Sequence, residues 1–170
     1  MKAAAIVFAV TMLVAAGASA QVTDPQIAKI VVTANQVDID AGKLAAAKAT
    51  NAEVKKFAQT MVTDHTGVNK QAVALVTKLK VTPADNDTAK SLYDGGVKNV
   101  TNLKGLKGRE FDKAYIDNEV AYHTAVIDAV DKVLIPGAQN AELKALLVSV
   151  RPAFVAHLDH AKMIQSSLSK

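Results

Sequence analysis

The chain has 170 residues, a formal charge of +4 and no cysteine, and 50% of its residues are hydrophobic. This length accommodates one domain with a sizeable core, but not two domains of ordinary size. The absence of cysteine excludes a disulfide framework and lipid attachment through an N-terminal cysteine. The mild positive charge comes without the mixture of basic and aromatic residues typical of nucleic-acid surfaces, so no nucleic-acid partner is expected.

The first twenty residues have the pattern of a secretory signal peptide. Lys2 precedes an apolar run that ends near Gly17, and residues 18–20 read Ala-Ser-Ala, as at a signal cleavage site. We therefore expect cleavage near Ala20 and a periplasmic or secreted mature protein. Residues 21–170 are expected to form a single domain. No segment of that domain is long and apolar enough to be a predicted transmembrane span.

Apolar residues recur at intervals of three and four in four long segments, a spacing that predicts amphipathic helices. Residues 81–108, between the second and third segments, are less regular, and Gly95-Gly96 is expected to interrupt a short helical insert there. The sequence thus predicts an all-α fold, an antiparallel four-helix bundle with a long crossover between helices two and three. The four predicted helices cover about residues 26–48, 51–79, 109–134 and 140–168.

Three of the four histidines fall on the apolar faces of these predicted helices. At 100° per residue, His65, His123 and His157 each take a core-facing position on a different helix. His160 lies nearly at a right angle to His157 and is expected at the surface. Acidic residues at or beside the same apolar faces are Asp38, Asp64, Asp112 and Glu119.

The helical rise places several of these polar residues at one level of the bundle. At ~1.5 Å per residue, His65 lies roughly 21 Å along its helix, level with Asp38 on the antiparallel neighbour. His157 lies roughly 30 Å along the fourth helix, level with Glu119. Because His123 is one turn from Glu119, all five residues are predicted to share one polar layer in the core.

Such a layer has two interpretations, since an unpaired charge in a core costs several kcal/mol. In the first, each imidazole donates to a carboxylate, and a metal-free layer fixes the helix register. In the second, neutral imidazoles and a carboxylate bind one transition-metal ion, with zinc, copper, iron and manganese all open. The candidate ligands are the five layer residues. Supporting or structural polar roles are assigned to Asp64, Asp112, Tyr115 and His160, with the Tyr115 hydroxyl expected at the surface.

Several local strings carry a resemblance to a known family. They are residues 37–45 (VDIDAGKLA), 61–65 (MVTDH) and 111–115 (FDKAY), followed by His123 and by Pro152 with His157-Leu158. Together they resemble the bacterial family catalogued as domain of unknown function 4142, whose members are often labelled outer-membrane proteins. The resemblance covers nearly all of residues 25–168. It implies export and a ferritin-like four-helix fold, and it implies no established reaction.

A ferritin-like fold invites comparison with di-iron centres, which use a Glu-x-x-His motif on each of two helices. This chain has Val62 three residues before His65 and Phe154 three residues before His157. Both motifs therefore lack their carboxylate. A di-iron centre is not expected, and a single ion in a histidine-rich site fits these residues better.

Three classes of function stay open. The first is a non-enzymatic exported bundle that binds a metal or a partner, with a link to envelope stress implied only by the family resemblance. The second is a small metalloenzyme, redox or hydrolytic, that uses an open coordination position at the histidines. The third is a structural or interaction protein with a metal-free polar core. No catalytic residue, protein partner or oligomeric state is assigned.

Overall fold

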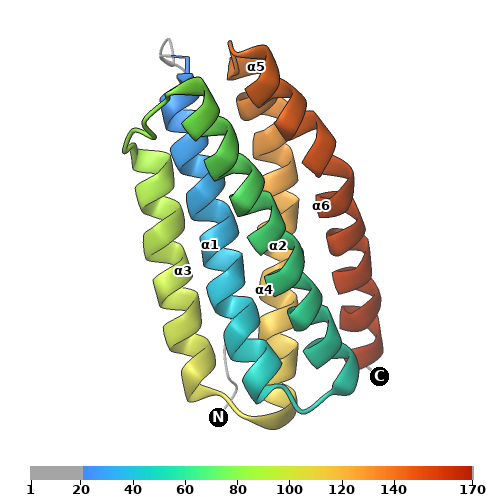
Figure 1. Ribbon diagram of the computed structural model, residues 1–170. Coiled ribbons are helices and arrows are strands. Elements are labelled where there is room, and N and C mark those ends of the chain that lie inside the picture. Colours follow the sequence, from blue (N-terminus) through green and yellow to red (C-terminus); the bar gives the residue numbers. More distant parts are fainter. Residues whose placement is uncertain (1–20, 170) are drawn as a thin grey trace.

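The structure is a computed structural model that describes residues 21–169, so the predicted signal peptide and its cleavage site lie outside the described residues. Within this range all regular structure is helical, which confirms the all-α prediction. Five long helices lie side by side (Figure 1), with α1 packed against both α2 and α3, and α4 packed against α6. The long helices are α1 (Asp24–Lys48), α2 (Ala52–Leu79), α3 (Asp87–Gly105), α4 (Gly108–Ala129) and α6 (Ala141–Leu168).

Short polar side chains set the beginnings of these helices. The Asn51 side chain accepts hydrogen bonds from two backbone N–H groups in the first turn of α2, and Asn140 does the same for α6. Thr23 and Gln26 form a capping box at the start of α1. These contacts satisfy N–H groups that have no partner inside a helix. Asn51 and Asn140 are thus the N-caps of α2 and α6, and Thr23 is the N-cap of α1.

The segment predicted as an irregular crossover forms a complete helix, α3, which packs along α1. The predicted interruption at Gly95-Gly96 is wrong, because α3 continues through both glycines. A Cβ atom on Gly96 would lie 2.7 Å from the side chain of Val37, whereas one on Gly95 would meet nothing within 4 Å. The missing side chain at position 96 therefore lets α3 approach α1 closely.

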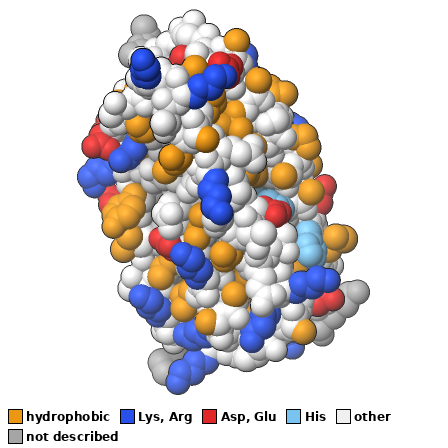
Figure 2. Space-filling model, in the orientation of Figure 1, with side chains coloured by type: hydrophobic (Ala, Val, Ile, Leu, Met, Phe, Trp, Pro, Cys, Tyr) orange, Lys and Arg blue, Asp and Glu red, His pale blue; other side chains and the backbone are white. Residues whose placement is uncertain are grey.

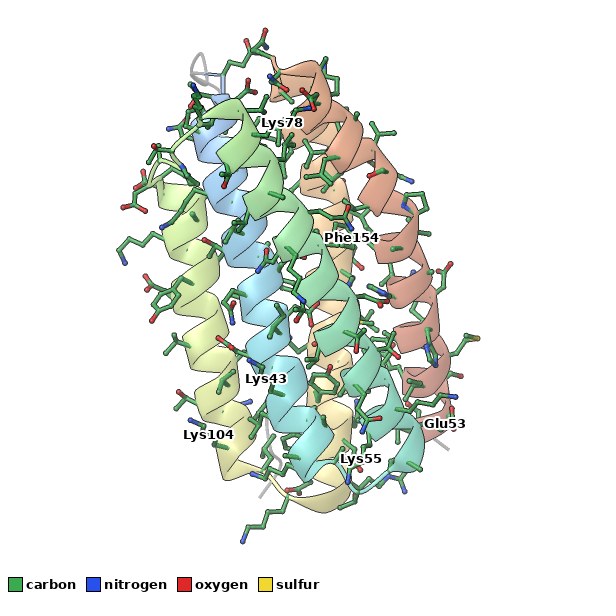
Figure 3. The ribbon with its side chains drawn as sticks, viewed as in Figure 1. Lys43, Glu53, Lys55, Lys78, Lys104 and Phe154 are labelled. Carbon is green, nitrogen blue, oxygen red and sulfur yellow. The ribbon has the colours of Figure 1, made fainter. Side chains whose placement is uncertain are left out.

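The apolar core consists of two clusters of buried residues. The Ile27 cluster includes Ile27, Val68, Val130 and Phe154, and the Phe57 cluster includes Ala41, Phe57, Met61, Ile116 and Ala161. Figure 3 shows Phe154 between the helices, while Lys43, Lys55 and Lys104 extend outwards. Among residues 21–169, no helix combines the length and the hydrophobicity needed to cross a bilayer.

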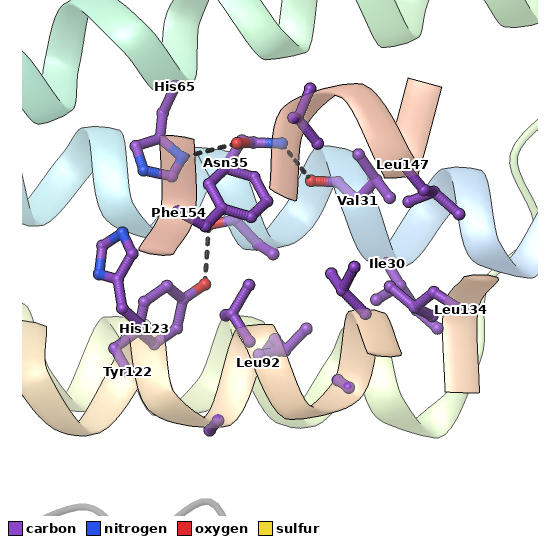
Figure 4. Close-up of a pocket in the computed structure, with 16 residues that line it drawn as sticks. Ile30, Val31, Asn35, His65, Leu92, Tyr122, His123, Leu134, Leu147 and Phe154 are labelled. Atoms are coloured by element: carbon purple, nitrogen blue, oxygen red, sulfur yellow. Dashed lines mark hydrogen bonds between the residues drawn. The ribbon is translucent and has the colours of Figure 1, made fainter. Parts of the chain in front are cut away.

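The end of α4 departs from α-helical geometry in a way that the periodicity did not predict. A π-helical turn, η1 (Val130–Leu134), follows α4 and leads into the short α5 (Ile135–Gly137). In this turn the backbone N–H of Ile135 donates to the carbonyl of Val130. Pro136 has no N–H to continue the α-helical pattern, which accounts for a change of register next to it. Val130 and Leu134 line an apolar cavity of about 50 Å³ that reaches His65 and His123 (Figure 4).

Candidate metal centre

Five buried polar side chains from four helices meet between the two apolar clusters. They are the five residues that the sequence places at one level, and each is at most 6% exposed. Asp38 comes from α1, His65 from α2, Glu119 and His123 from α4, and His157 from α6. We call these five residues the polar layer.

The three imidazoles of the polar layer form a nearly equilateral triangle. The ring centroids are 5.5 Å apart for His65 and His123, 5.3 Å for His65 and His157, and 5.4 Å for His123 and His157. One nitrogen from each ring lies within 4.8 Å of the other two. Phe154 stacks on His65 with an interplanar angle of 4° and restricts the rotation of that ring. Three helices thus direct imidazoles into one small volume.

Hydrogen bonding fixes the tautomer of His65. Its Nδ1 lies 2.6 Å from Oδ1 of Asn35, whose Nδ2 donates to the backbone carbonyl of Val31 (Figure 4). Since the Asn35 amide nitrogen is used in that second bond, Oδ1 faces the ring and accepts the Nδ1 proton of His65. The other ring nitrogen, Nε2, is buried and has no hydrogen-bond partner. A neutral His65 therefore presents a lone pair at Nε2.

The same division of roles holds for the other two imidazoles. Nδ1 of His123 lies 3.2 Å from the backbone carbonyl oxygen of Glu119 and 3.4 Å from its carboxylate, and both are acceptors. Nε2 of His157 lies 2.9 Å from the carboxylate of Asp64. The opposite nitrogens, Nε2 of His123 and Nδ1 of His157, are buried without a hydrogen-bond partner. Each imidazole thus donates through one nitrogen and keeps the other unpaired.

Asp38 lies against two of these unpaired nitrogens. Its Oδ2 is 2.9 Å from Nε2 of His65 and 3.5 Å from Nε2 of His123. Neither carboxylate oxygen has a partner in hydrogen-bonding geometry. Burial would raise the pKa of Asp38, but the facing imidazoles, His65 foremost, outweigh it and hold the pKa below its ordinary value. The layer therefore contains a buried carboxylate that is ionised and needs a positive charge beside it.

The second carboxylate of the layer has a different protonation behaviour. Burial, together with the charge of Asp38, raises the pKa of Glu119 to about 7, against the opposing effect of His123. Burial would lower the pKa of His123, yet its contacts with Glu119 and Asp38 raise it above the ordinary value. Burial is the main cause that lowers the pKa of His157. Without a metal, protons on Glu119 and His123 must therefore balance the charge.

The spacing of the Asp38 contacts also suits a bound cation. Ligand atoms about 2.1 Å from a metal lie about 3.0 Å apart in octahedral and about 3.4 Å apart in tetrahedral coordination. The contacts from Oδ2 of Asp38, 2.9 Å and 3.5 Å, are close to these separations. In charge, a divalent cation would balance two ionised carboxylates among three neutral imidazoles.

The remaining sequence candidates lie outside the polar layer. Asp64 lies on α2 and is exposed, and its carboxylate contacts Nε2 of His157 on α6. Asp112 accepts hydrogen bonds from Thr50 and Asn51, so it ties the turn between α1 and α2 to α4. The ring of His160 packs edge-to-face on Phe57, with centroids 5.3 Å apart. His160 therefore has a packing contact as well as partial exposure to solvent.

The structure corrects the expectation for Tyr115 and adds one residue that the sequence reasoning missed. Tyr115 is fully buried against Phe57, so the prediction of a surface hydroxyl is wrong. Burial, followed by the charges of Glu119 and Asp38, places the pKa of Tyr115 well above its ordinary value. The missed residue is Asn35, which is buried three residues before Asp38. Its position on the apolar face of the first predicted helix was the available signal.

Comparison with known proteins agrees with the resemblance of the local strings. The family model described as Domain of unknown function (DUF4142) matches residues 10–164. No match was found among curated proteins or among solved structures. Because the matched range spans most of the 170 residues, the chain belongs to the DUF4142 family.

Proposed function

We propose that this protein binds one divalent transition-metal ion in its polar layer. The ligands are Nε2 of His65, Nε2 of His123, Nδ1 of His157 and the carboxylate of Asp38, with Glu119 as a further carboxylate. One observation carries the proposal: one nitrogen of each ring is buried without a hydrogen-bond partner, the opposite nitrogen contacts a fixed acceptor, and the three imidazoles place ligand nitrogens within 4.8 Å of one another. This is the usual arrangement around metal-bound histidine, whose second N–H is held by a carboxylate, carbonyl or similar acceptor.

A metal-free layer accounts less well for the same contacts. A buried polar atom without a hydrogen bond costs about 1–3 kcal/mol, and more when it is charged. Unpartnered atoms of this kind occur on each of the five layer residues, including both carboxylate oxygens of Asp38. A cation would satisfy the imidazole nitrogens, and His123 also lies with Asp38 and Glu119 in a second group whose ligand atoms are within 4.8 Å of one another.

The donor set narrows the choice of ion. Imidazole nitrogen and carboxylate oxygen, without thiolate, suit zinc, copper, iron and manganese. We propose binding as the function, because the described residues supply ligands for an ion. A single ion also agrees with the absence of the paired Glu-x-x-His motifs that serve a di-iron centre.

We further propose that the mature protein is exported and that its helices have a ferritin-like arrangement. The basic start, apolar run and Ala-Ser-Ala sequence of the first twenty residues support export. The placement of ligands on α1, α2, α4 and α6 supports a four-helix frame, with α3 in the connection between α2 and α4. A role in envelope stress rests only on the family resemblance.

Metal analysis of untagged protein tests the binding proposal. Elemental analysis and titrations with Zn²⁺, Cu²⁺, Fe²⁺ and Mn²⁺ are expected to give one ion per chain for at least one metal. His65→Asn and His123→Asn should abolish stoichiometric binding, because each removes an imidazole ligand. His160→Asn is the matched control, since it changes the fourth histidine, which lies outside the polar layer, and it should bind as the wild type does.

Circular dichroism of each variant shows whether loss of binding is separate from loss of fold. Wild-type protein that takes up none of the four metals stoichiometrically would overturn the proposal. Equal binding by a folded His65→Asn and His123→Asn double variant would overturn it as well. The Co²⁺ absorption spectrum then separates binding from catalysis, because a closed four-coordinate site counts against an open catalytic position.

A further inference from the structure

The polar layer meets solvent at one edge. Within the layer, Asp38, Glu119 and His123 are at most 1% exposed, and His65 is 3% exposed. The side chain of His157 is 8% exposed, and its partner Asp64 is 44% exposed. Figure 2 shows histidine and acidic side chains next to each other on this face of the molecule. The Asp64 and His157 pair is therefore the place where water and ions come closest to the buried ligands.

Packing explains why the layer is more accessible at this edge. Asp64 lies on α2 and His157 on α6, and these two helices contact each other less extensively than α1 contacts α2 or α4 contacts α6. On the side of α1 and α4, the hydroxyl of Tyr122 donates to the carbonyl of Ala34 at 2.8 Å. Leu92 of α3 is buried in the Ile27 cluster, against which Tyr122 also packs. That side is thus covered by a third helix and a hydrogen-bonded ring, whereas the seam of α2 and α6 is not.

We infer that the metal ion reaches the polar layer through the seam of α2 and α6, and that Asp64 is the carboxylate that first attracts it. This inference rests on the proposed function. Asp64 faces solvent and is also hydrogen-bonded to a proposed ligand, with 2.9 Å between its Oδ2 and Nε2 of His157. A negative charge at the mouth of a buried site raises the local concentration of cations and the association rate. Asp64 therefore has a kinetic role in addition to orienting His157.

Stopped-flow mixing with Co²⁺ at low ionic strength tests this role. Asp64→Asn keeps an oxygen that can accept the His157 proton but removes the charge. We expect its association rate constant to fall on the order of 10-fold, and the difference to shrink in 1 M salt, where the Debye length is about 3 Å. Asp64→Glu should restore the rate. Asp159→Asn, which removes an exposed acid two residues from His157, is the matched control and should leave the rate unchanged.

The possible results separate the access route from the proposed function. Equal association rates for Asp64→Asn and wild type at low salt would overturn the route. So would an effect confined to the dissociation rate, because Asp64 would then only position His157. Wild-type protein that binds no Co²⁺ or any other tested metal at equilibrium overturns the proposed function, and the route falls with it.

Discussion

His65, His123 and His157 carry the same side chain but are held by three different acceptors. The acceptors are the amide oxygen of Asn35, a backbone carbonyl with a carboxylate on the same residue, and the carboxylate of Asp64. A carboxylate partner makes an imidazole a more basic ligand than a neutral partner does. The three unpaired nitrogens are therefore not equivalent donors.

Asn35 offers a test of how much the surrounding acceptors matter. In Asn35→Leu the Nδ1 proton of His65 loses its acceptor, and the tautomer with the proton on Nε2, next to Asp38, becomes favoured. We expect metal affinity to fall about 10- to 100-fold with the ligands themselves intact. Competition titration against a chelator of known affinity measures the change.

Asn69→Leu is the matched control for this variant. Asn69 also donates to the backbone of α1, at Val32, and among the described residues no hydrogen bond joins it to a histidine of the layer. It should retain wild-type affinity. Unchanged affinity in a folded Asn35→Leu protein would show that the acceptor is not needed to hold the tautomer.

At the residue scale, the sequence supplied the members of the polar layer but not their hydrogen bonds. The rotation and the rise per residue of an α-helix are regular, so the sequence alone places Asp38, His65 and Glu119 at one level. The bond between His65 and Asn35 depends on the separation and rotation of two neighbouring helices, which periodicity does not contain. The burial of Tyr115 was mispredicted for a similar reason, since the α2 residue Phe57 covers that side of α4.

At the scale of elements, α3 shows how packing overrides local preference. Glycine within a helix costs about 1 kcal/mol relative to alanine, so Gly95-Gly96 predicts a break. In the structure, Gly96 allows close contact with Val37 of α1, and burial of Leu92 and Leu103 adds apolar contacts. A sequence segment with two glycines can therefore be a full helix when a neighbour requires the space. The four longer segments were predictable because their apolar faces are continuous.

The two neighbouring glycines of α3 give a matched pair of variants. Gly96→Ala should destabilise the protein by about 1–3 kcal/mol, because its Cβ would overlap the side chain of Val37. Gly95→Ala should stabilise it by about 0.5–1 kcal/mol, since the added methyl group meets nothing within 4 Å and alanine favours the helix. Urea denaturation measures both changes.

The close contact can be checked separately from the helix propensity. Adding Val37→Ala to Gly96→Ala should recover part of the lost stability, because it removes the atoms that the new Cβ would meet. Stabilisation by Gly96→Ala alone, comparable with that by Gly95→Ala, would contradict close packing of α3 on α1.

At the scale of the whole molecule, the protonation of the polar layer makes stability depend on pH. The folded protein raises the pKa of Glu119 from 4.5 to about 7. A raised carboxyl pKa means that the folded state holds the proton more tightly, so this contribution is complete below about pH 4.5 and is lost as the pH rises through about 7. We expect metal-free protein to lose about 2.5 kcal/mol through this group between pH 5 and pH 8.

Comparison with Glu119→Gln isolates this contribution in urea denaturation over the same pH range. Glutamine does not titrate, so the variant should lose most of the pH dependence. The raised pKa of His123 acts in the same direction, and the lowered pKa of His157 acts in the opposite direction. Identical pH profiles of wild type and Glu119→Gln would contradict a buried, titrating Glu119. In metal-loaded protein, binding should instead strengthen as the pH rises, because protons compete for the ligands.

The position of the polar layer between two apolar clusters also restricts how the helices can slide past one another. On α6, His157 lies between Phe154 of the Ile27 cluster and Ala161 of the Phe57 cluster, and the order is repeated or reversed on α1, α2 and α4. A slip by one turn, about 5.4 Å, would carry a charged or polar group into aliphatic surroundings and put an apolar side chain in its place. Small aliphatic residues alone would tolerate several alignments, so the layer selects one of them.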